Sequence, residues 1–208
     1  MSTYALIGDS HAQAVFPRLK KLLTPLGHEV LISKPRAGWT TKKHLNPTDG
    51  STSLASLLGE ARADVVVFSL GGNNHSLKES YLEPIKEAVQ IAKDSGAKRI
   101  FWVGPAVALR DDVEKRHFWT TGFLKHHLPS MDVEFIDARE FTQTGHRDDK
   151  VHFTRSQYDI WTQKVFEALQ KQPVSLFKRS LPWVLGSISI AIPFIIYLIR
   201  KNTDGKKK

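Results

Sequence analysis

The stretch Tyr4-Ala5-Leu6-Ile7-Gly8-Asp9-Ser10-His11 decides the fold. Its apolar run stops at Gly8, and a serine follows two residues later. Apolar residues with helical spacing come next, over residues 12–26, and Gly27 ends that helix. The stretch therefore predicts a buried strand, a tight turn and a helix, which is the first unit of a parallel sheet. Ser10 would lie at the carboxyl end of that strand.

Strands and helices alternate along the rest of the chain. We expect further strands at Glu29–Ser33, Asp64–Leu70, Arg99–Val103 and Val133–Ile136, and further helices at residues 51–62, 84–94, 111–128 and 154–171. Strict alternation, with strands that are apolar throughout, is typical of a parallel sheet covered on both faces. The sequence thus predicts an α/β fold, a flavodoxin-like three-layer α/β/α sandwich whose five-stranded parallel sheet has the order 2-1-3-4-5.

Charge is distributed unevenly. The 208 residues carry a net charge of +9, but residues 171–208 hold eight Lys or Arg and one Asp, a net of +7. Residues 1–170 hold 22 Lys or Arg and 20 Asp or Glu, a net of +2. A nearly neutral domain without an aromatic-interleaved basic stripe argues against a nucleic-acid partner. There is no cysteine, which excludes disulfides, zinc thiolates and cysteine nucleophiles.

The basic C-terminal region contains an uncharged run of 19 residues, 181–199. As a helix it would be about 28 Å long, close to the ~30 Å hydrocarbon core of a bilayer. A buried core helix is the alternative, but such runs are usually shorter and are rarely bracketed by basic pairs. We therefore expect a folded domain at 1–171, a linker at 172–180, a transmembrane helix at 181–199 and a basic tail at 200–208.

Three loops should meet at the carboxyl edge of the sheet, because strands 2, 1 and 3 are neighbours in this order. They contain Gly38, Ser10 and the run Gly71-Gly72-Asn73-Asn74. A fourth loop, after the fifth strand, carries Asp149 and His152. A serine near a histidine that a carboxylate orients is the arrangement of nucleophilic acyl transfer.

These blocks resemble those of the SGNH (GDSL-type) hydrolases. The likeness covers about residues 1–170: Gly8-Asp9-Ser10, Gly38, Gly71-x-Asn73 and Asp149-x-x-His152, in the family's order. It implies ester hydrolysis without a metal or cofactor. It also implies Ser10 as nucleophile, His152 as base, Asp149 as its orienting acid, and an oxyanion hole of Ser10, Gly38 and Asn73. Asn74 departs from the aspartate usual at that position.

Four further side chains flank the expected site, and we expect them to line it: His11, Trp39, His75 and Phe153. Each has an ordinary alternative as an exposed loop residue or a packed side chain. The loop around His152 also allows a metal-site interpretation, with His146, Asp148, Asp149 and His152 as ligands, although a solvated charged loop explains these residues as well.

The resulting hypothesis is a membrane-anchored serine esterase that hydrolyses acyl, and in particular acetyl, esters, on a glycan or a small molecule. The form Gly8-Asp9-Ser10-His11-Ala12 resembles carbohydrate O-acetyl esterases. The alternatives are a lysophospholipase- or thioesterase-type lipid hydrolase, and an inactive SGNH-like module acting as a tethered binding or virion structural protein. Without a recognisable signal peptide, a single-pass C-terminal anchor predicts a cytoplasmic-facing domain, and the membrane of a virus particle or cell envelope is the alternative.

Overall fold

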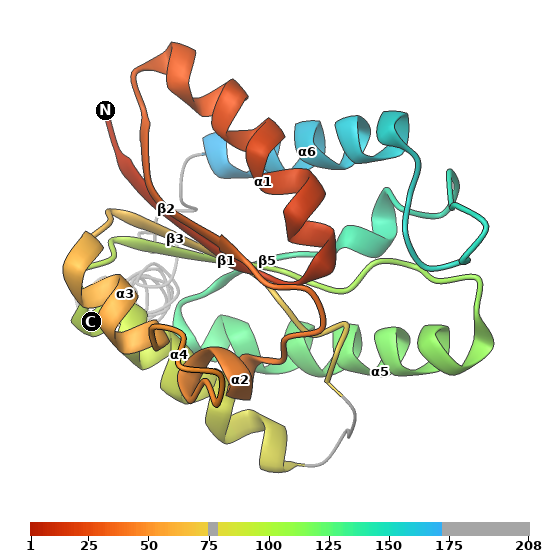
Figure 1. Ribbon diagram of the computed structural model, residues 1–208, viewed down its shortest axis with the longest axis horizontal. Coiled ribbons are helices and arrows are strands. Elements are labelled where there is room, and N and C mark those ends of the chain that lie inside the picture. The colour runs from red at the N-terminus through yellow and green to blue at the C-terminus, as the bar shows by residue number, and fades with distance from the viewer. Residues whose placement is uncertain (75–78, 172–208) are drawn as a thin grey trace, which may run out of the picture. The chain divides into compact units, whose positions relative to one another are not determined.

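A single parallel sheet forms the middle layer of the computed structural model, which describes residues 1–74 and 79–171 (Figure 1). Its strands are β1 (Thr3–Gly8), β2 (Glu29–Pro35), β3 (Val65–Ser69), β4 (Arg99–Val103) and β5 (Glu134–Ile136). Neighbouring strands pair in parallel, and the order is β2-β1-β3-β4-β5. The predicted fold class and strand order are confirmed.

Helices cover both faces of the sheet. Figure 1 shows α1 (Ser10–Leu23) and α6 (Arg155–Gln170) on one face, and α2 (Thr41–Leu45), α3 (Leu54–Ala61), α4 (Leu82–Asp94) and α5 (Asp111–His127) on the other. Short 3-10 turns lie at Thr24–Leu26 (η1), Glu79–Tyr81 (η2), Leu128–Met131 (η3) and Ala138–Glu140 (η4). The sequence did not predict α2, whose five residues are too few for a periodic pattern.

The central strands β1, β3 and β4 are largely apolar because both of their faces are buried, whereas the edge strand β2 has no buried residue. Leu6, Val67 and Phe101 belong to the core beneath α1 and α6. Their neighbours in the sequence, such as Phe68 and Trp102, point the opposite way into the core beneath α3 to α5. Side chains alternate between the two faces of a strand, so a sheet covered on both faces needs hydrophobic residues at successive positions.

Gly8 allows the tight passage from β1 into α1. A Cβ atom at this position would lie 2.3 Å from the Cβ of Ala12 and 3.1 Å from the ring of Phe16. Asp9 then caps the helix, because its Oδ1 accepts the backbone N–H of His11 at 3.0 Å. Ser10 therefore becomes the first residue of α1, at the carboxyl end of β1. The helix starts two residues before the predicted position.

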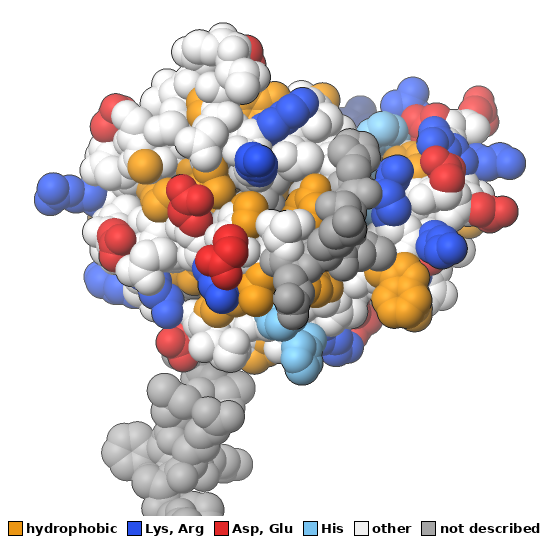
Figure 2. Space-filling view, turned by 90° about the horizontal axis from the view of Figure 1, so that it is seen from below, with side chains coloured by type: hydrophobic (Ala, Val, Ile, Leu, Met, Phe, Trp, Pro, Cys, Tyr) orange, Lys and Arg blue, Asp and Glu red, His pale blue; other side chains and the backbone are white. Residues whose placement is uncertain are grey.

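His75 and the predicted linker, transmembrane helix and basic tail at 172–208 lie outside the described residues. Within residues 1–74 and 79–171, no helix combines the length and the hydrophobicity that a membrane span requires. On the face shown in Figure 2, acidic and basic side chains are interspersed rather than gathered by sign.

Candidate active site

A hydroxyl, an imidazole and a carboxylate form a continuous chain of contacts at the carboxyl edge of the sheet. Ser10 Oγ lies 3.1 Å from His152 Nε2, and His152 Nδ1 lies 2.9 Å from Asp149 Oδ2. Ser10 comes from the start of α1, whereas the other two come from the loop between β5 and α6. Such a chain can pass a proton from the hydroxyl to the imidazole while the carboxylate fixes the imidazole tautomer.

Hydrogen bonds within the loop around His152 fix its conformation. Arg147 donates its backbone N–H to the carbonyl of His152 at 2.7 Å, and Thr154 donates to Gly145 at 2.8 Å. Asp149 Oδ1 accepts the backbone N–H groups of Val151 at 2.9 Å and of His152 at 2.8 Å.

These two backbone donors, together with His152, hold the pKa of the Asp149 carboxyl well below its usual range. The carboxyl is therefore ionised at neutral pH, although its side chain is 48% exposed. Its ionisation rests on local hydrogen bonds rather than on a buried charge pair.

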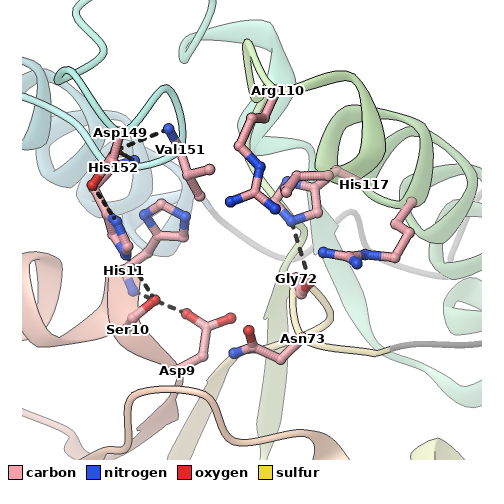
Figure 3. A pocket seen from close by; sticks show the side chains of 12 residues that line it. Asp9, Ser10, His11, Gly72, Asn73, Arg110, His117, Asp149, Val151 and His152 are labelled. Atoms are coloured by element: carbon pink, nitrogen blue, oxygen red, sulfur yellow. Dashed lines mark hydrogen bonds and ion pairs between the residues drawn. The ribbon is translucent and has the colours of Figure 1, made fainter.

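Ser10 and His152 open into a cavity of about 260 Å³. Figure 3 shows Ser10, Asp149 and His152 on one side of this cavity and α5 on the other. The lining residues come from the turn after β1, the loop after β3, α5 with the residue before it, and the loop before α6: Asp9, Ser10, His11, Gly72, Asn73, Arg110, Val113, Arg116, His117, Asp149, Val151 and His152.

The three expected oxyanion donors are not equally placed. Ser10 and Asn73 line the cavity, whereas Gly38 is not among its lining residues. Ser10 is the first residue of α1, where backbone N–H groups have no intrahelical acceptor. Asn73 Nδ2 donates to the carbonyl of Trp39 at 3.2 Å, and this bond ties the Gly38 loop to the loop after β3.

The four side chains that we expected to line the site are placed differently. His11 lines the cavity, is 5% exposed, and has its Nδ1 3.0 Å from Tyr158 Oη. Burial lowers the pKa of His11 to about 3, so this imidazole is neutral at physiological pH. Trp39 instead packs against His44 at 4.8 Å between ring centroids.

Phe153 does not line the cavity. It is 1% exposed and belongs to the core beneath α1 and α6, with its ring 5.7 Å from that of His11. His146 and Phe153 form an isolated antiparallel bridge. His152, the residue before Phe153, lines the cavity instead.

Two buried side chains that sequence reasoning did not select border the site. Asp9 is 5% exposed, and burial raises the pKa of its carboxyl to about 7. His117 has its Nδ1 2.7 Å from the carbonyl of Ala106 and its Nε2 3.2 Å from the carbonyl of Gly72. A Cβ atom at Gly72 would lie 3.1 Å from His117 Nε2, so a larger residue there would require the imidazole to shift.

His117 could have been found from its place on α5. The buried positions of this helix include three polar residues, His117, Thr120 and Thr121, beside Val113 and Leu124. Polar residues on the buried stripe of a helix are unusual, because burial of a polar group is costly without a partner. A stripe of this kind indicates that the helix faces a polar site.

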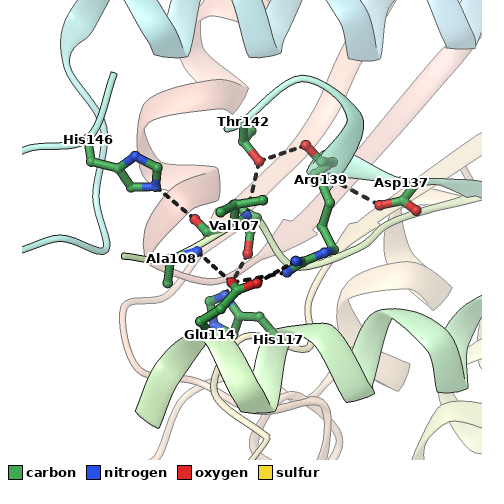
Figure 4. A network of polar contacts seen from close by, with 10 residues as sticks. Val107, Ala108, Glu114, His117, Asp137, Arg139, Thr142 and His146 are labelled. Atoms are coloured by element: carbon green, nitrogen blue, oxygen red, sulfur yellow. Dashed lines mark hydrogen bonds and ion pairs between the residues drawn. The ribbon is translucent and has the colours of Figure 1, made fainter. Parts of the chain in front are cut away.

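A polar network holds α5 beside the loop of His152 (Figure 4). The Glu114 carboxylate is bonded by the Arg139 guanidinium and accepts the backbone N–H of Ala108 at 2.9 Å. On the other side, His146 Nε2 lies 3.0 Å from the carbonyl of Val107. These bonds connect the start of α5, the segment before it and the loop after β5, so the two walls of the cavity are fixed to each other.

The metal-site interpretation of the loop finds no geometric support. Among the described residues, no three His, Asp or Glu side chains are grouped as a metal ion would require. Asp149 is instead bonded to His152 and to backbone N–H groups.

No family model matches the chain, and no curated protein matches it by sequence. Solved structures match it by fold. TesA is 18% identical with a TM-score of 0.66, and the match covers 81% of this chain and 98% of TesA. A carbohydrate acetylesterase family member from Sinorhizobium meliloti is 16% identical with a TM-score of 0.66, over 81% of this chain and 97% of its own.

A lipase/acylhydrolase from Enterococcus faecalis is 17% identical with a TM-score of 0.60, over 83% of this chain and 100% of its own. At these identities the likeness is one of fold. The described domain thus has the fold of known ester hydrolases, and its candidate site lies at the carboxyl edge of that fold.

Proposed function

We propose that the chain is a serine esterase of SGNH type that removes short acyl groups, acetyl above all, through an acyl-enzyme. The observation that carries the proposal is the contact chain from Asp149 to His152 to Ser10, at 2.9 and 3.1 Å, opening into a cavity. The fold shared with a carbohydrate acetylesterase family member and a lipase/acylhydrolase supports the same reaction class.

In the first half-reaction, Ser10 Oγ attacks the ester carbonyl while His152 Nε2 takes its proton. The resulting tetrahedral oxyanion is stabilised by the backbone N–H of Ser10 and the amide of Asn73, both at the cavity. The intermediate collapses to an acyl-serine, and His152 gives its proton to the departing alcohol. Water, deprotonated by His152, then releases the acid and restores Ser10.

The size of the cavity favours a short acyl group. Ligand pockets usually occupy about 300–1,000 Å³, and this cavity of about 260 Å³ is smaller. An acetyl group with part of its alcohol fills such a space, whereas a long acyl chain would extend outside it. The alternative, a lipid or thioester hydrolase, is favoured only by the fold shared with a lipase/acylhydrolase.

The test is hydrolysis of 4-nitrophenyl esters of increasing acyl length by the full chain. We expect turnover of the acetate, declining activity on longer esters, and no turnover by Ser10→Ala. Ser130→Ala, at an exposed serine that bonds only to the carbonyl of His127, is the matched control. A preference for long acyl chains would favour the lipid alternative. Absence of turnover at every length would favour the inactive binding or structural module.

We also propose that residues 181–199 anchor the domain in a membrane, with the domain facing the cytoplasm. The support is their uncharged length between basic residues. The full chain should stay with membranes during alkaline carbonate extraction and should be open to protease added from the cytoplasmic side. Release by carbonate would refute the anchor. Protection from protease would point to a virus particle or cell envelope instead.

A further inference from the structure

The wall of the cavity opposite Ser10 carries two guanidinium groups. Val113, Arg116 and His117 share one face of α5, at positions i, i+3 and i+4, and all three line the cavity. Arg110, the residue before α5, also lines it, and Figure 3 shows its guanidinium across the cavity from His152. A substrate whose ester reaches Ser10 would have its other end near these groups.

The two arginines differ in their partners. Arg110 donates from Nε and Nη2 to the carboxylate of Asp112 at 2.9 and 2.7 Å. Arg116 forms no ion pair with the described residues, and its buried Nε has no hydrogen-bond partner among them. The nearest acid along the helix, Glu114, is already bonded to Arg139. Buried donors without an acceptor are costly and rare in folded proteins. Arg116 is half-buried and lines the cavity, so a ligand bound there can supply an acceptor to its guanidinium.

The two acids that line the cavity, Asp9 and Asp149, form no ion pair with Arg116. Asp149 is committed to His152 and to two backbone N–H groups. Asp9 is buried with a pKa raised to about 7, so a large share of it is uncharged at neutral pH. Neither acid of the cavity lining forms an ion pair with Arg116, so the anionic group of a substrate can pair with its guanidinium.

We propose that Arg116 forms an anion subsite that binds a carboxylate or phosphate carried by the ester substrate. This deepens the proposed function and rests on it, because the subsite lies in the same cavity as Ser10. An arginine presents parallel N–H donors that match both groups in a bidentate way. The cavity of about 260 Å³ holds little more than a short acyl group and its immediate neighbours, so the charge lies close to the ester that is cleaved.

Paired esters test the subsite by activity. We compare kcat/KM for 4-acetoxybenzoate, which is anionic, with that for its neutral methyl ester, and 4-acetoxyphenyl phosphate replaces the carboxylate by a phosphate. The ratio of anionic to neutral substrate should fall about ten- to hundred-fold in Arg116→Gln, the range for a lost charge-assisted hydrogen bond. Comparing ratios between variants removes the difference in reactivity between the esters.

Lys115→Gln is the matched control. It removes the same charge from the same helix turn, but Lys115 is exposed and does not line the cavity, so its ratio should equal that of the wild type. Arg116→Lys, which keeps the charge but loses the forked donors, should give an intermediate ratio. The anionic ester whose ratio falls more in Arg116→Gln, the carboxylate or the phosphate, identifies the anion that the subsite prefers. An unchanged ratio in Arg116→Gln would overturn the subsite and leave the esterase standing.

A binding measurement separates the two proposals. Titration calorimetry of the Ser10→Ala variant with 4-acetoxybenzoate should give an affinity that falls at least about ten-fold when Arg116→Gln is added. Equal affinities would overturn the anion subsite whatever the activity. Binding that depends on Arg116, in a wild-type chain that hydrolyses none of the esters, would overturn the esterase and support the subsite alone.

Discussion

Asp149→Asn replaces the carboxylate of the contact chain by an amide of nearly the same size and shape. In the structure, Asp149 Oδ1 accepts two backbone N–H groups, those of Val151 at 2.9 Å and His152 at 2.8 Å. Those donors select the orientation of the new amide, because only its oxygen can accept from them. The amide nitrogen must then point to His152 Nδ1, which lies 2.9 Å from the present Oδ2.

An amide nitrogen in that place donates to Nδ1 and reverses the imidazole tautomer. The proton then resides on Nε2, 3.1 Å from Ser10 Oγ, and the imidazole cannot take the serine proton. A wrong tautomer in a triad costs about 10⁴ in kcat, which corresponds to roughly 5.5 kcal/mol of barrier. Asp149 and His152 are 48% and 37% exposed, so the lost charge attraction adds little, and the tautomer carries the effect.

The assay is kcat and KM on 4-nitrophenyl acetate, together with thermal unfolding. Asp149→Asn should lower kcat about 10³- to 10⁴-fold with KM and the unfolding temperature nearly unchanged. Asp148→Asn is the matched control, since it removes the adjacent charge from the same loop without a place at the cavity. A kcat within ten-fold of the wild type, or an equal loss in the control, would refute the orienting role.

Three further changes test other parts of the site. Gly8→Ala should lower the free energy of unfolding in urea by about 1–3 kcal/mol, because its Cβ would lie 2.3 Å from that of Ala12; unchanged stability would contradict the close approach. Asp9→Asn should make the free energy of unfolding less dependent on pH between about pH 4 and pH 7, as measured by urea unfolding at each pH. The folded carboxyl, with a pKa near 7, keeps a proton that the unfolded one loses near pH 4, so wild-type stability is highest below that range and falls as pH rises through it; an equal slope in both proteins would argue against a raised pKa. Asn73→Ala should lower kcat about 10²- to 10³-fold through loss of an oxyanion donor, and wild-type kcat would remove Asn73 from that role.

Much of the fold followed from local patterns in the sequence. Apolar runs such as Asp64–Leu70 and Arg99–Val103 marked strands buried on both faces, and the structure has strands at both places. The motif blocks around Ser10, Asn73 and His152 meet at one cavity, because parallel strands bring their carboxyl ends to one edge of the sheet. The alternating pattern predicts the parallel sheet and its strand ends, and the flavodoxin-like order places these loops side by side.

The rest of the site depends on tertiary packing that no local pattern specifies. Arg116 and His117 face the cavity only because α5 crosses beside the loop after β3. Gly38 is absent from the lining because its loop contacts the site through the carbonyl of Trp39. Phe153 follows His152 directly, yet its side chain is buried in the core. The sequence motifs therefore identified the loops that form the cavity, but not which side chains of each loop line it.

Reaction of the full chain with a fluorophosphonate, followed by mass spectrometry of its peptides, tests most directly whether Ser10 is an activated nucleophile. The geometry from Asp149 through His152 to Ser10 predicts a single phosphonyl adduct on the peptide that contains Ser10. The same experiment on Ser10→Ala should yield no adduct. A folded wild-type chain that stays unlabelled, or one labelled at another serine, would contradict the account.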